Sequence, residues 1–265
     1  MSYADIAVAV EQHVATVEIR RPPLNFFDHG LIRQIADAFA ELDTDPNCRV
    51  IILASEGKAF CAGANFGTGQ SDGSGNTDFT EDGFQNTTGT LYREGARLFD
   101  NKKPIIAAVQ GAAIGGGLGL SLTADFRIAC KEARFAANFV KLGIHQGFGI
   151  SITLPRLIGQ QAAMNMLLTG RRVNGVEALE LGLVDQLVDI DDLRASARAL
   201  ADEIAENAPL AVMSVRATMR AGLAEEIRTA TDHELQEQQR LRSTHDAIEG
   251  IKAVSERRPG IFNGR

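Results

Sequence analysis

Residues Lys103–Asp125 read KPIIAAVQGAAIGGGLGLSLTAD, and this stretch decides the fold class. The apolar run Pro104–Val109 has the length of a short buried strand. The three glycines Gly115–Gly117 then begin an apolar segment that we expect to be helical through about Thr123. A strand, a glycine-rich turn and a helix in this order indicate an α/β protein.

The flanking sequence extends this pattern. Alternating apolar and polar residues predict a hairpin of two strands, Ile6–Val10 and Val14–Ile19. Asp28 is expected to cap a helix whose apolar residues recur at helical spacing, and Val50–Ala54 to form a buried strand. We predict an α/β part over residues 1–190 and a helical region over 191–265. Further strands are expected over 126–130 and 184–188, and helices over about 90–101, 174–182, 192–206, from 207, 225–241 and 244–255.

Composition and charge narrow the class of protein. The chain has 265 residues, of which 45% are apolar and 23% charged, as in a soluble globular protein. No apolar run approaches the roughly 20 residues that span a bilayer, and the N-terminus lacks a signal-peptide pattern, so we expect a cytoplasmic protein without a membrane partner. The net charge of −7 argues against a nucleic-acid partner. Three scattered cysteines, without metal-ligand spacing, predict neither disulfides nor a metal site.

Two glycine-bearing segments follow short apolar strands. Lys58–Asn65 reads KAFCAGAN and Gln110–Leu118 reads QGAAIGGGL. Backbone N–H groups approach a ligand closely where side chains are small, and the first N–H groups of a helix have no partner within it. Two such groups from separate segments would form an oxyanion hole. The alternative is that the glycines only permit tight turns and close packing. Neither segment matches a nucleotide-phosphate motif.

Several motifs together resemble the enoyl-CoA hydratase/isomerase, or crotonase, superfamily. They are FCAGA at 60–64, KPIIAAVQG at 103–111, GGG at 115–117, LTGRR at 168–172 and SERRP at 255–259, and their order covers nearly the whole chain. The resemblance implies a spiral of repeated β-β-α units, with C-terminal helices that build a homotrimer or a hexamer of two trimers. It also implies an acyl-CoA thioester as substrate, with no cofactor besides the coenzyme A of that substrate.

The resemblance also assigns roles by motif position. The backbone N–H groups of Ala64 and Gly116 would bind the thioester oxygen and stabilise the charge that develops on it. Ala62 lies where the family binds the adenine ring, and Arg257 where a basic residue meets the coenzyme A phosphates. Asn65 stands where many relatives carry an aspartate, and we place it in the substrate-binding set.

The chain departs from the family's hydratases at both positions that move protons. Those enzymes use two glutamates as acid and base, and the matching positions here are Gly119 and Phe139, whose side chains cannot transfer a proton. Phe139 is instead expected to line the acyl site. His145 is our candidate for proton transfer, because an imidazole has an ordinary pKa of about 6.5. The alternatives are a purely structural hydrogen bond from His145, or a carboxylate such as Glu81 from the long mobile loop predicted over Phe66–Gly89.

Three functions follow from these observations. The favoured one is an acyl-CoA enzyme with non-hydratase chemistry, such as isomerisation, hydrolysis or elimination. The second is a slow enoyl-CoA hydratase of the fatty-acid β-oxidation type, because binding and an oxyanion hole alone retain some catalysis. The third is an acyl-CoA binder without catalysis.

Overall fold

A six-stranded sheet lies at the centre of the fold, in the order β1-β2-β3-β4-β6-β9. The computed structural model describes residues 3–64 and 88–265, so Asn65, Glu81 and the predicted loop up to residue 87 lie outside the described residues. Strands β1 and β2 form the predicted antiparallel hairpin, and the other neighbouring pairs are parallel. The strands are β1 Ile6–Glu11, β2 Val14–Ile19, β3 Val50–Ser55, β4 Ile105–Val109, β6 Phe126–Cys130 and β9 Gln186–Val188.

A second sheet of three short strands was missed by the sequence analysis. It contains β5 (Ala112–Ile114), β7 (Arg134–Ala136) and β8 (Arg172–Asn174) in that order. Strands of three residues are too short to show a reliable alternation of apolar and polar side chains. This sheet carries the glycine segment after β4 away from the central sheet and leads it into α4.

The helices confirm most of the predicted elements. They are α1 His29–Thr44, α3 Thr90–Arg97, α4 Gly116–Ser121, α5 Ile150–Thr169, α6 Gly175–Glu180, α7 Leu193–Ala205, α8 Pro209–Met219, α9 Leu223–Arg242 and α10 His245–Ser255, with short 3₁₀ turns η2 Leu98–Asp100, η3 Asn138–Leu142 and η4 Ile190–Asp192. Asp28 caps α1 as expected, because its Oδ1 accepts a hydrogen bond of 2.8 Å from the amide of Leu31. Asp192 precedes α7 but its side chain makes no cap.

Helix α5 was not predicted, although it is as long as α9. It contains Pro155, and Gly159 within it has a non-helical backbone with φ of 77°. Both residues interrupt the regular spacing of apolar side chains on which a helix prediction rests.

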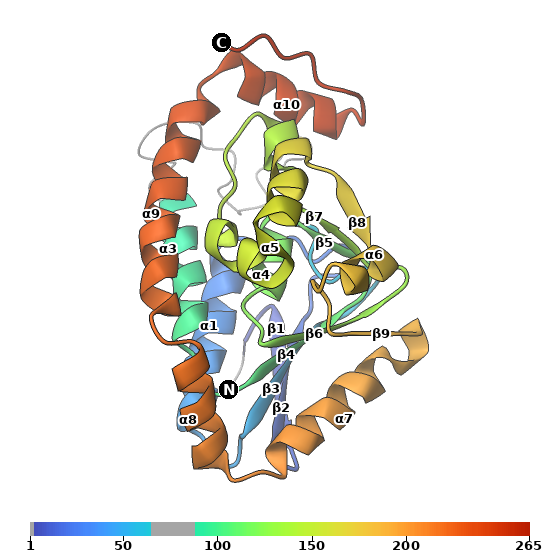
Figure 1. The fold of residues 1–265 in the computed structure, drawn as a ribbon, viewed down its shortest axis with the longest axis vertical. Coiled ribbons are helices and arrows are strands. Elements are labelled where there is room, and N and C mark those ends of the chain that lie inside the picture. Colours follow the sequence, from blue (N-terminus) through green and yellow to red (C-terminus); the bar gives the residue numbers. More distant parts are fainter. Residues whose placement is uncertain (1–2, 65–87) are drawn as a thin grey trace.

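Helices cover both faces of the central sheet (Figure 1). On one face, Leu193, Ala197, Ala201 and Ala205 of α7 are buried against strand residues such as Ile52 and Ile106. The opposite face packs against α1 and α3 in the larger core. Helix α9 lies along α3, and α10 lies against η3. The helices after residue 190 therefore pack on the α/β part of the same chain, and their role in a trimer stays a prediction.

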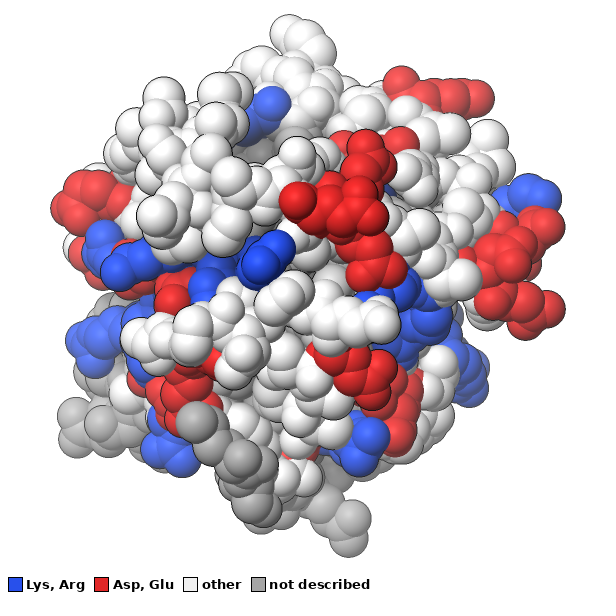
Figure 2. Space-filling view, turned by 90° about the horizontal axis from the view of Figure 1, so that it is seen from below, with Lys and Arg blue, Asp and Glu red and all other residues white. Residues whose placement is uncertain are grey.

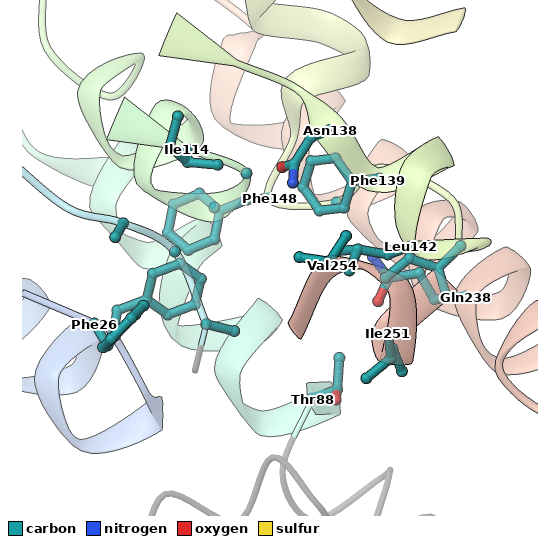
Figure 3. Close-up of a pocket in the computed structure, with 18 of the residues that line it drawn as sticks. Phe26, Thr88, Ile114, Asn138, Phe139, Leu142, Phe148, Gln238, Ile251 and Val254 are labelled. Carbon is teal, nitrogen blue, oxygen red and sulfur yellow. The ribbon is translucent and has the colours of Figure 1, made fainter. Parts of the chain in front are cut away.

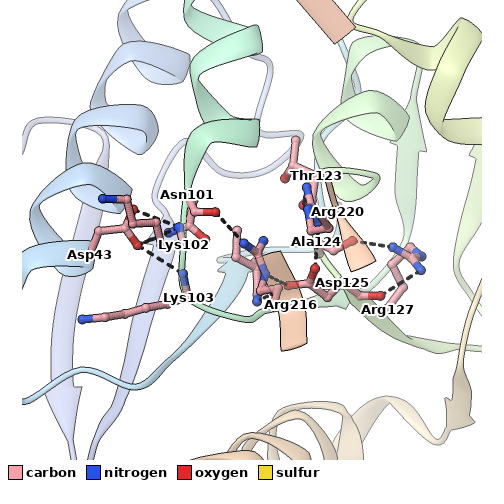
Figure 4. A network of polar contacts seen from close by, with 11 residues as sticks. Asp43, Asn101, Lys102, Lys103, Thr123, Ala124, Asp125, Arg127, Arg216 and Arg220 are labelled. Atoms are coloured by element: carbon pink, nitrogen blue, oxygen red, sulfur yellow. Dashed lines mark hydrogen bonds and ion pairs between the residues drawn. The ribbon is translucent and has the colours of Figure 1, made fainter. Parts of the chain in front are cut away.

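The segment that decides the fold ends in a network of charges (Figure 4). Asp125 Oδ2 accepts hydrogen bonds from the Ile105 amide at 2.8 Å and from Arg216 Nε at 2.7 Å. Its Oδ1 accepts one from Arg220 at 2.7 Å. Since Arg216 belongs to α8 and Arg220 follows directly after it, Asp125 attaches the end of that helix to the start of β4 and has a structural role.

The outer surface carries charges of both signs. On the face that Figure 2 shows, Lys and Arg side chains alternate in small groups with Asp and Glu side chains, and no continuous basic stripe crosses it. No helix in the described part of the chain is long and apolar enough to cross a membrane.

Candidate active site

A cavity of about 530 Å³ lies between α3, α4, η3, α9 and α10 (Figure 3). Most of its wall is apolar. The apolar side chains on it are Phe26, Phe27, Leu91, Ile114, Phe139, Leu142, Ile144, Phe148, Ile251 and Val254. This size and composition suit a small organic group bound with little water.

The two glycine-bearing segments run side by side at this cavity. The Cys61 amide donates a hydrogen bond of 2.8 Å to the Ala112 carbonyl, and the Ile114 amide donates one of 3.0 Å to the Cys61 carbonyl. Residues Cys61 and Ala113 form a parallel bridge. The backbone leading to Ala64 and the backbone leading to Gly116 are thereby held next to each other, as the sequence analysis predicted.

Glycine is required where these segments touch. Gly63 has a φ of +86°, and a Cβ atom on it would lie 2.6 Å from the Ile114 carbonyl oxygen. A Cβ atom on Gly117 would lie 2.0 Å from the Cys61 carbonyl oxygen. Real Cβ atoms do not come this close to backbone, so any side chain at either position would force the segments apart.

The amides of Ala64 and Gly116 lack a backbone acceptor in the described part of the chain. Both residues line the cavity, and neither amide donates to a backbone oxygen of any described residue. Gly116 is the first residue of α4, where a helical N–H has no partner in its own helix. The Phe27 ring packs directly on Gly116, because a Cβ atom there would lie 2.1 Å from Phe27 Cζ.

Most of the predicted site residues meet at this cavity. Ala62, Ala64, Gly116, Phe139 and Arg257 all line it. Asn65 lies outside the described residues.

His145 is the one described candidate that the structure does not bring to the cavity wall. Its Nδ1 lies 2.8 Å from the carbonyl oxygen of Gln146, and its ring lies edge-on to that of His233, with the centroids 5.9 Å apart. This contact matches the structural alternative for His145. The position of a residue in a turn next to a pocket does not fix the direction of its side chain. For this reason the sequence could not show whether His145 reaches the cavity. The catalytic role of His145 stays a prediction.

The polar groups on the wall are neutral hydrogen-bonding groups and arginines. Tyr92, Asn138 and Gln238 line the cavity, and no Asp, Glu or His does so among the described residues. Burial raises the pKa of Tyr92 well above its ordinary value, so its hydroxyl stays protonated and is able to donate. Gln238 is held by a hydrogen bond of 2.8 Å from its Nε2 to the His145 carbonyl.

A carboxylate that the sequence analysis missed lies behind this wall. Glu234 of α9 is fully buried, and its two oxygens accept hydrogen bonds from the amides of Gly149 at 2.8 Å and Ser151 at 3.1 Å. Burial raises the pKa of Glu234. Positions 227, 231, 234 and 238 of this helix are all buried at helical spacing, but three of them are polar, so the sequence carries no apolar periodicity that would identify this inner face.

Three arginines line the cavity, and only Arg257 was predicted. Arg172 of β8 and Arg242 of α9 join it from segments far apart in the sequence. Guanidinium groups suit phosphate, so this side of the cavity can bind an anionic ligand.

Metal or thiol chemistry finds no support among the described residues. They contain no cluster of three His, Cys, Asp or Glu side chains that could hold a metal ion. Cys61 is fully buried, and burial raises the pKa of its thiol to about 12, so it remains a protonated apolar side chain.

Comparisons with known proteins agree with this geometry. The model of the family described as enoyl-CoA hydratase/isomerase matches residues 9–265. A carnitinyl-CoA dehydratase from Proteus mirabilis is 35% identical over 257 residues, which cover 95% of each chain. The crystal structure of an enoyl-CoA hydratase from Mycobacterium avium subsp. paratuberculosis is 26% identical with a TM-score of 0.84, covering 99% of this chain and 100% of that one. An enoyl-CoA hydratase from Bacillus anthracis is 28% identical with a TM-score of 0.76, covering 99% and 100%.

Proposed function

The chain belongs to the enoyl-CoA hydratase/isomerase family, and we propose that it acts on an acyl-CoA thioester through the backbone N–H groups of Ala64 and Gly116. The observation that carries this proposal is a pair of amides on adjacent segments at an apolar cavity, neither of which has a backbone acceptor among the described residues. They would bind the thioester oxygen and stabilise it as an enolate or tetrahedral oxyanion forms, and removal of one such donor typically costs about 10²–10³ in rate.

The coenzyme A part of the substrate would lie toward the arginines. Arg257, Arg172 and Arg242 supply positive charge for its phosphates, and the Ala62 backbone would meet the adenine ring. The acyl group would then lie toward the aromatic side of the cavity, where Phe139 is one of the contacts. We further propose that the active protein is a homotrimer or a hexamer of two trimers, as the family resemblance implies.

The chemistry we favour is not hydration. Among the described residues, the cavity wall carries the neutral polar groups Tyr92, Asn138 and Gln238 and no carboxylate, and positions 119 and 139 carry Gly and Phe. Such a wall binds and polarises a thioester but does not activate water by itself. We favour isomerisation, hydrolysis or elimination of an acyl-CoA, and each of these reactions needs a proton-transferring group besides these three side chains. The name of the Proteus relative, a carnitinyl-CoA dehydratase, favours the second candidate, a slow enoyl-CoA hydratase.

Hydration of crotonyl-CoA separates these two candidates. The pure protein is compared with a known hydratase at equal concentration, and the product is identified by mass. We expect a rate at least about 10⁴-fold below that of the hydratase, on the scale of losing both acid and base groups. A rate within about tenfold of the hydratase would overturn the non-hydratase proposal and show that another group supplies the proton transfer.

Calorimetric binding tests the coenzyme A thioester itself. Butyryl-CoA, which has no double bond to hydrate, should bind more tightly than free coenzyme A because the thioester oxygen gains the two amides. No binding of either ligand would contradict the proposal. Tight binding of many acyl-CoA esters without any product would support the non-catalytic alternative.

A further inference from the structure

Phe148 has an unusual backbone for a large side chain. It follows Gly147 in the turn before α5, with a φ of +66°, a region that favours glycine. Its side chain is nevertheless buried and lines the cavity. The ring lies next to that of Phe27, with the centroids 5.8 Å apart and the planes tilted by 49°. A strained residue persists only where its surroundings hold it, so the packing of this ring deserves an explanation.

Two glycines on neighbouring helices make room for the ring. A Cβ atom on Gly119 of α4 would lie 2.8 Å from both Cβ and Cδ1 of Phe148. A Cβ atom on Gly95 of α3 would lie 2.9 Å from its Cε2. The ring therefore occupies the volume that any side chain at position 119 would need, and the two positions exclude each other.

This packing lies beside the proposed oxyanion site. Gly116 and Gly119 are one turn apart on the same side of α4, and Phe27 covers the first as Phe148 covers the second. An acyl-CoA whose thioester oxygen is bound at Gly116 would thus place its first acyl carbons against these two rings. Figure 3 shows Phe148 facing the open part of the cavity, across from Leu142 and Val254.

We propose that Phe148 is the residue that determines acyl selectivity in this site. Resting on the proposed function, the inference is that the ring narrows the cavity beside the second and third acyl carbons. The site then accepts an unbranched aliphatic acyl group and rejects one that is bulky at those carbons. The same ring fills the space that a side chain at position 119 would need. Gly119 and Phe148 are therefore structurally coupled.

The test measures two Kd values, for butyryl-CoA and for benzoyl-CoA, whose ring is bulky at the second and third acyl carbons. Phe148→Gly removes the ring and suits the local backbone, since glycine readily adopts a positive φ. We expect the affinity for benzoyl-CoA relative to butyryl-CoA to rise at least about tenfold, the scale of a change in a hydrophobic substrate pocket. Phe99→Ala is the matched control, because Phe99 is equally buried but does not line the cavity, and its ratio should not change.

An unchanged ratio in folded Phe148→Gly that still binds butyryl-CoA would overturn the inference and leave the proposed function intact. Failure of the unmodified protein to bind either thioester would instead contradict the proposed function. Should Phe148→Gly not fold, Phe148→Leu keeps an apolar side chain and should shift the ratio in the same direction by a smaller amount. No shift in folded Phe148→Leu would then overturn the inference.

A double-mutant cycle tests the exclusion between the two positions. Gly119→Ala should lower the melting temperature and weaken butyryl-CoA binding, because its Cβ atom must displace the ring. The same substitution in the Phe148→Gly background should cost much less, as expected for residues in direct contact. Equal costs in both backgrounds would contradict the proposed packing.

Discussion

The two ends of one short segment, Gly115–Arg127, contrast sharply. At the first end, Gly116 lines an apolar cavity, and its amide has no backbone acceptor among the described residues. At the second end, the two carboxylate oxygens of Asp125 accept hydrogen bonds from the Ile105 amide, from Arg216 of α8 and from Arg220 directly after it. One end leaves hydrogen-bonding capacity unused, and the other uses it fully.

This difference in hydrogen bonding distinguishes a residue that binds ligand from a residue that stabilises the fold. A buried polar group is costly unless it is paired, so a free amide at a cavity is retained where a ligand can pair with it. A buried charge with partners on every side is consistent with a structural role. Both ends carry distinctive sequence motifs, and the hydrogen-bond partners distinguish their roles.

Asp125→Ala should cause the largest loss of stability. It leaves Arg216 and Arg220, whose side chains are 9% and 15% exposed, without their carboxylate. Breaking a fully buried ion pair costs about 3–5 kcal/mol of unfolding free energy, and because this pair is partly exposed we expect a loss between that value and that of an exposed pair, measured by urea denaturation. Asp189→Ala is the control, because its pair with Lys131 is 73% and 65% exposed and should be worth less than about 1 kcal/mol. Equal losses of unfolding free energy in the two variants would show that Asp125 is no more important to the fold than an exposed aspartate.

Gly116→Ala should act on the ligand more than on the fold. The new Cβ atom overlaps the Phe27 ring and shifts the amide that we assign to the thioester oxygen. We expect butyryl-CoA to bind at least about tenfold more weakly, which corresponds to losing one good hydrogen bond, with a smaller change for free coenzyme A. Calorimetry with both ligands measures the difference. Equal weakening of the two would show that the amide does not contact the thioester.

The buried side chain of Glu234 should stabilise the folded protein less as the pH rises, whereas a paired surface carboxylate stabilises it more. Burial raises its pKa, so the folded protein binds a proton that the unfolded chain has released. Its contribution to stability is complete below the unfolded pKa, about 4.3, and is lost as the pH rises through the folded value. The difference in unfolding free energy between the unmodified protein and Glu234→Gln should therefore decrease from pH 4.5 to 7.

Glu237 on the same helix is the control for this titration. Arg240 lowers its pKa, so the stabilisation from Glu237 is present at neutral pH and lost as the pH falls through the lowered value. The stability difference for Glu237→Gln should therefore stay nearly constant from pH 4.5 to 7, and the stabilisation should be lost only below the unfolded pKa of about 4.3. If the stability difference changed with pH in the same way for both variants, the raised pKa that we assign to the buried Glu234 would be wrong.

His145→Ala should have the smallest effect. Its ring contacts Gln146 and His233 and does not line the cavity, so coenzyme A affinity and crotonyl-CoA turnover should each change less than about threefold. Removing a working general acid or base typically costs about 10²–10⁴ in rate. A loss of that size, with coenzyme A binding intact, would restore the catalytic role predicted from the sequence.

Features with a local physical cause could be predicted from the sequence. The hairpin and the Asp28 cap depend on residues within a few positions of one another. The glycine segments were also identifiable, because close backbone contact at Gly63 and Gly117 excludes other residues. The second sheet and α5 were missed because three-residue strands and a helix interrupted by Pro155 and Gly159 lack a clear period.

By itself, the sequence determined which atoms are available: small residues at the two converging segments, and Gly and Phe at positions 119 and 139. Only the tertiary structure decided which of the other side chains reach the cavity. It brings in Arg172, Gln238 and Arg242, turns His145 away, and places the Phe148 ring over Gly119. The physical reason is that backbone conformation follows mainly from neighbours in the sequence, whereas the direction of a side chain follows from packing between segments far apart in it.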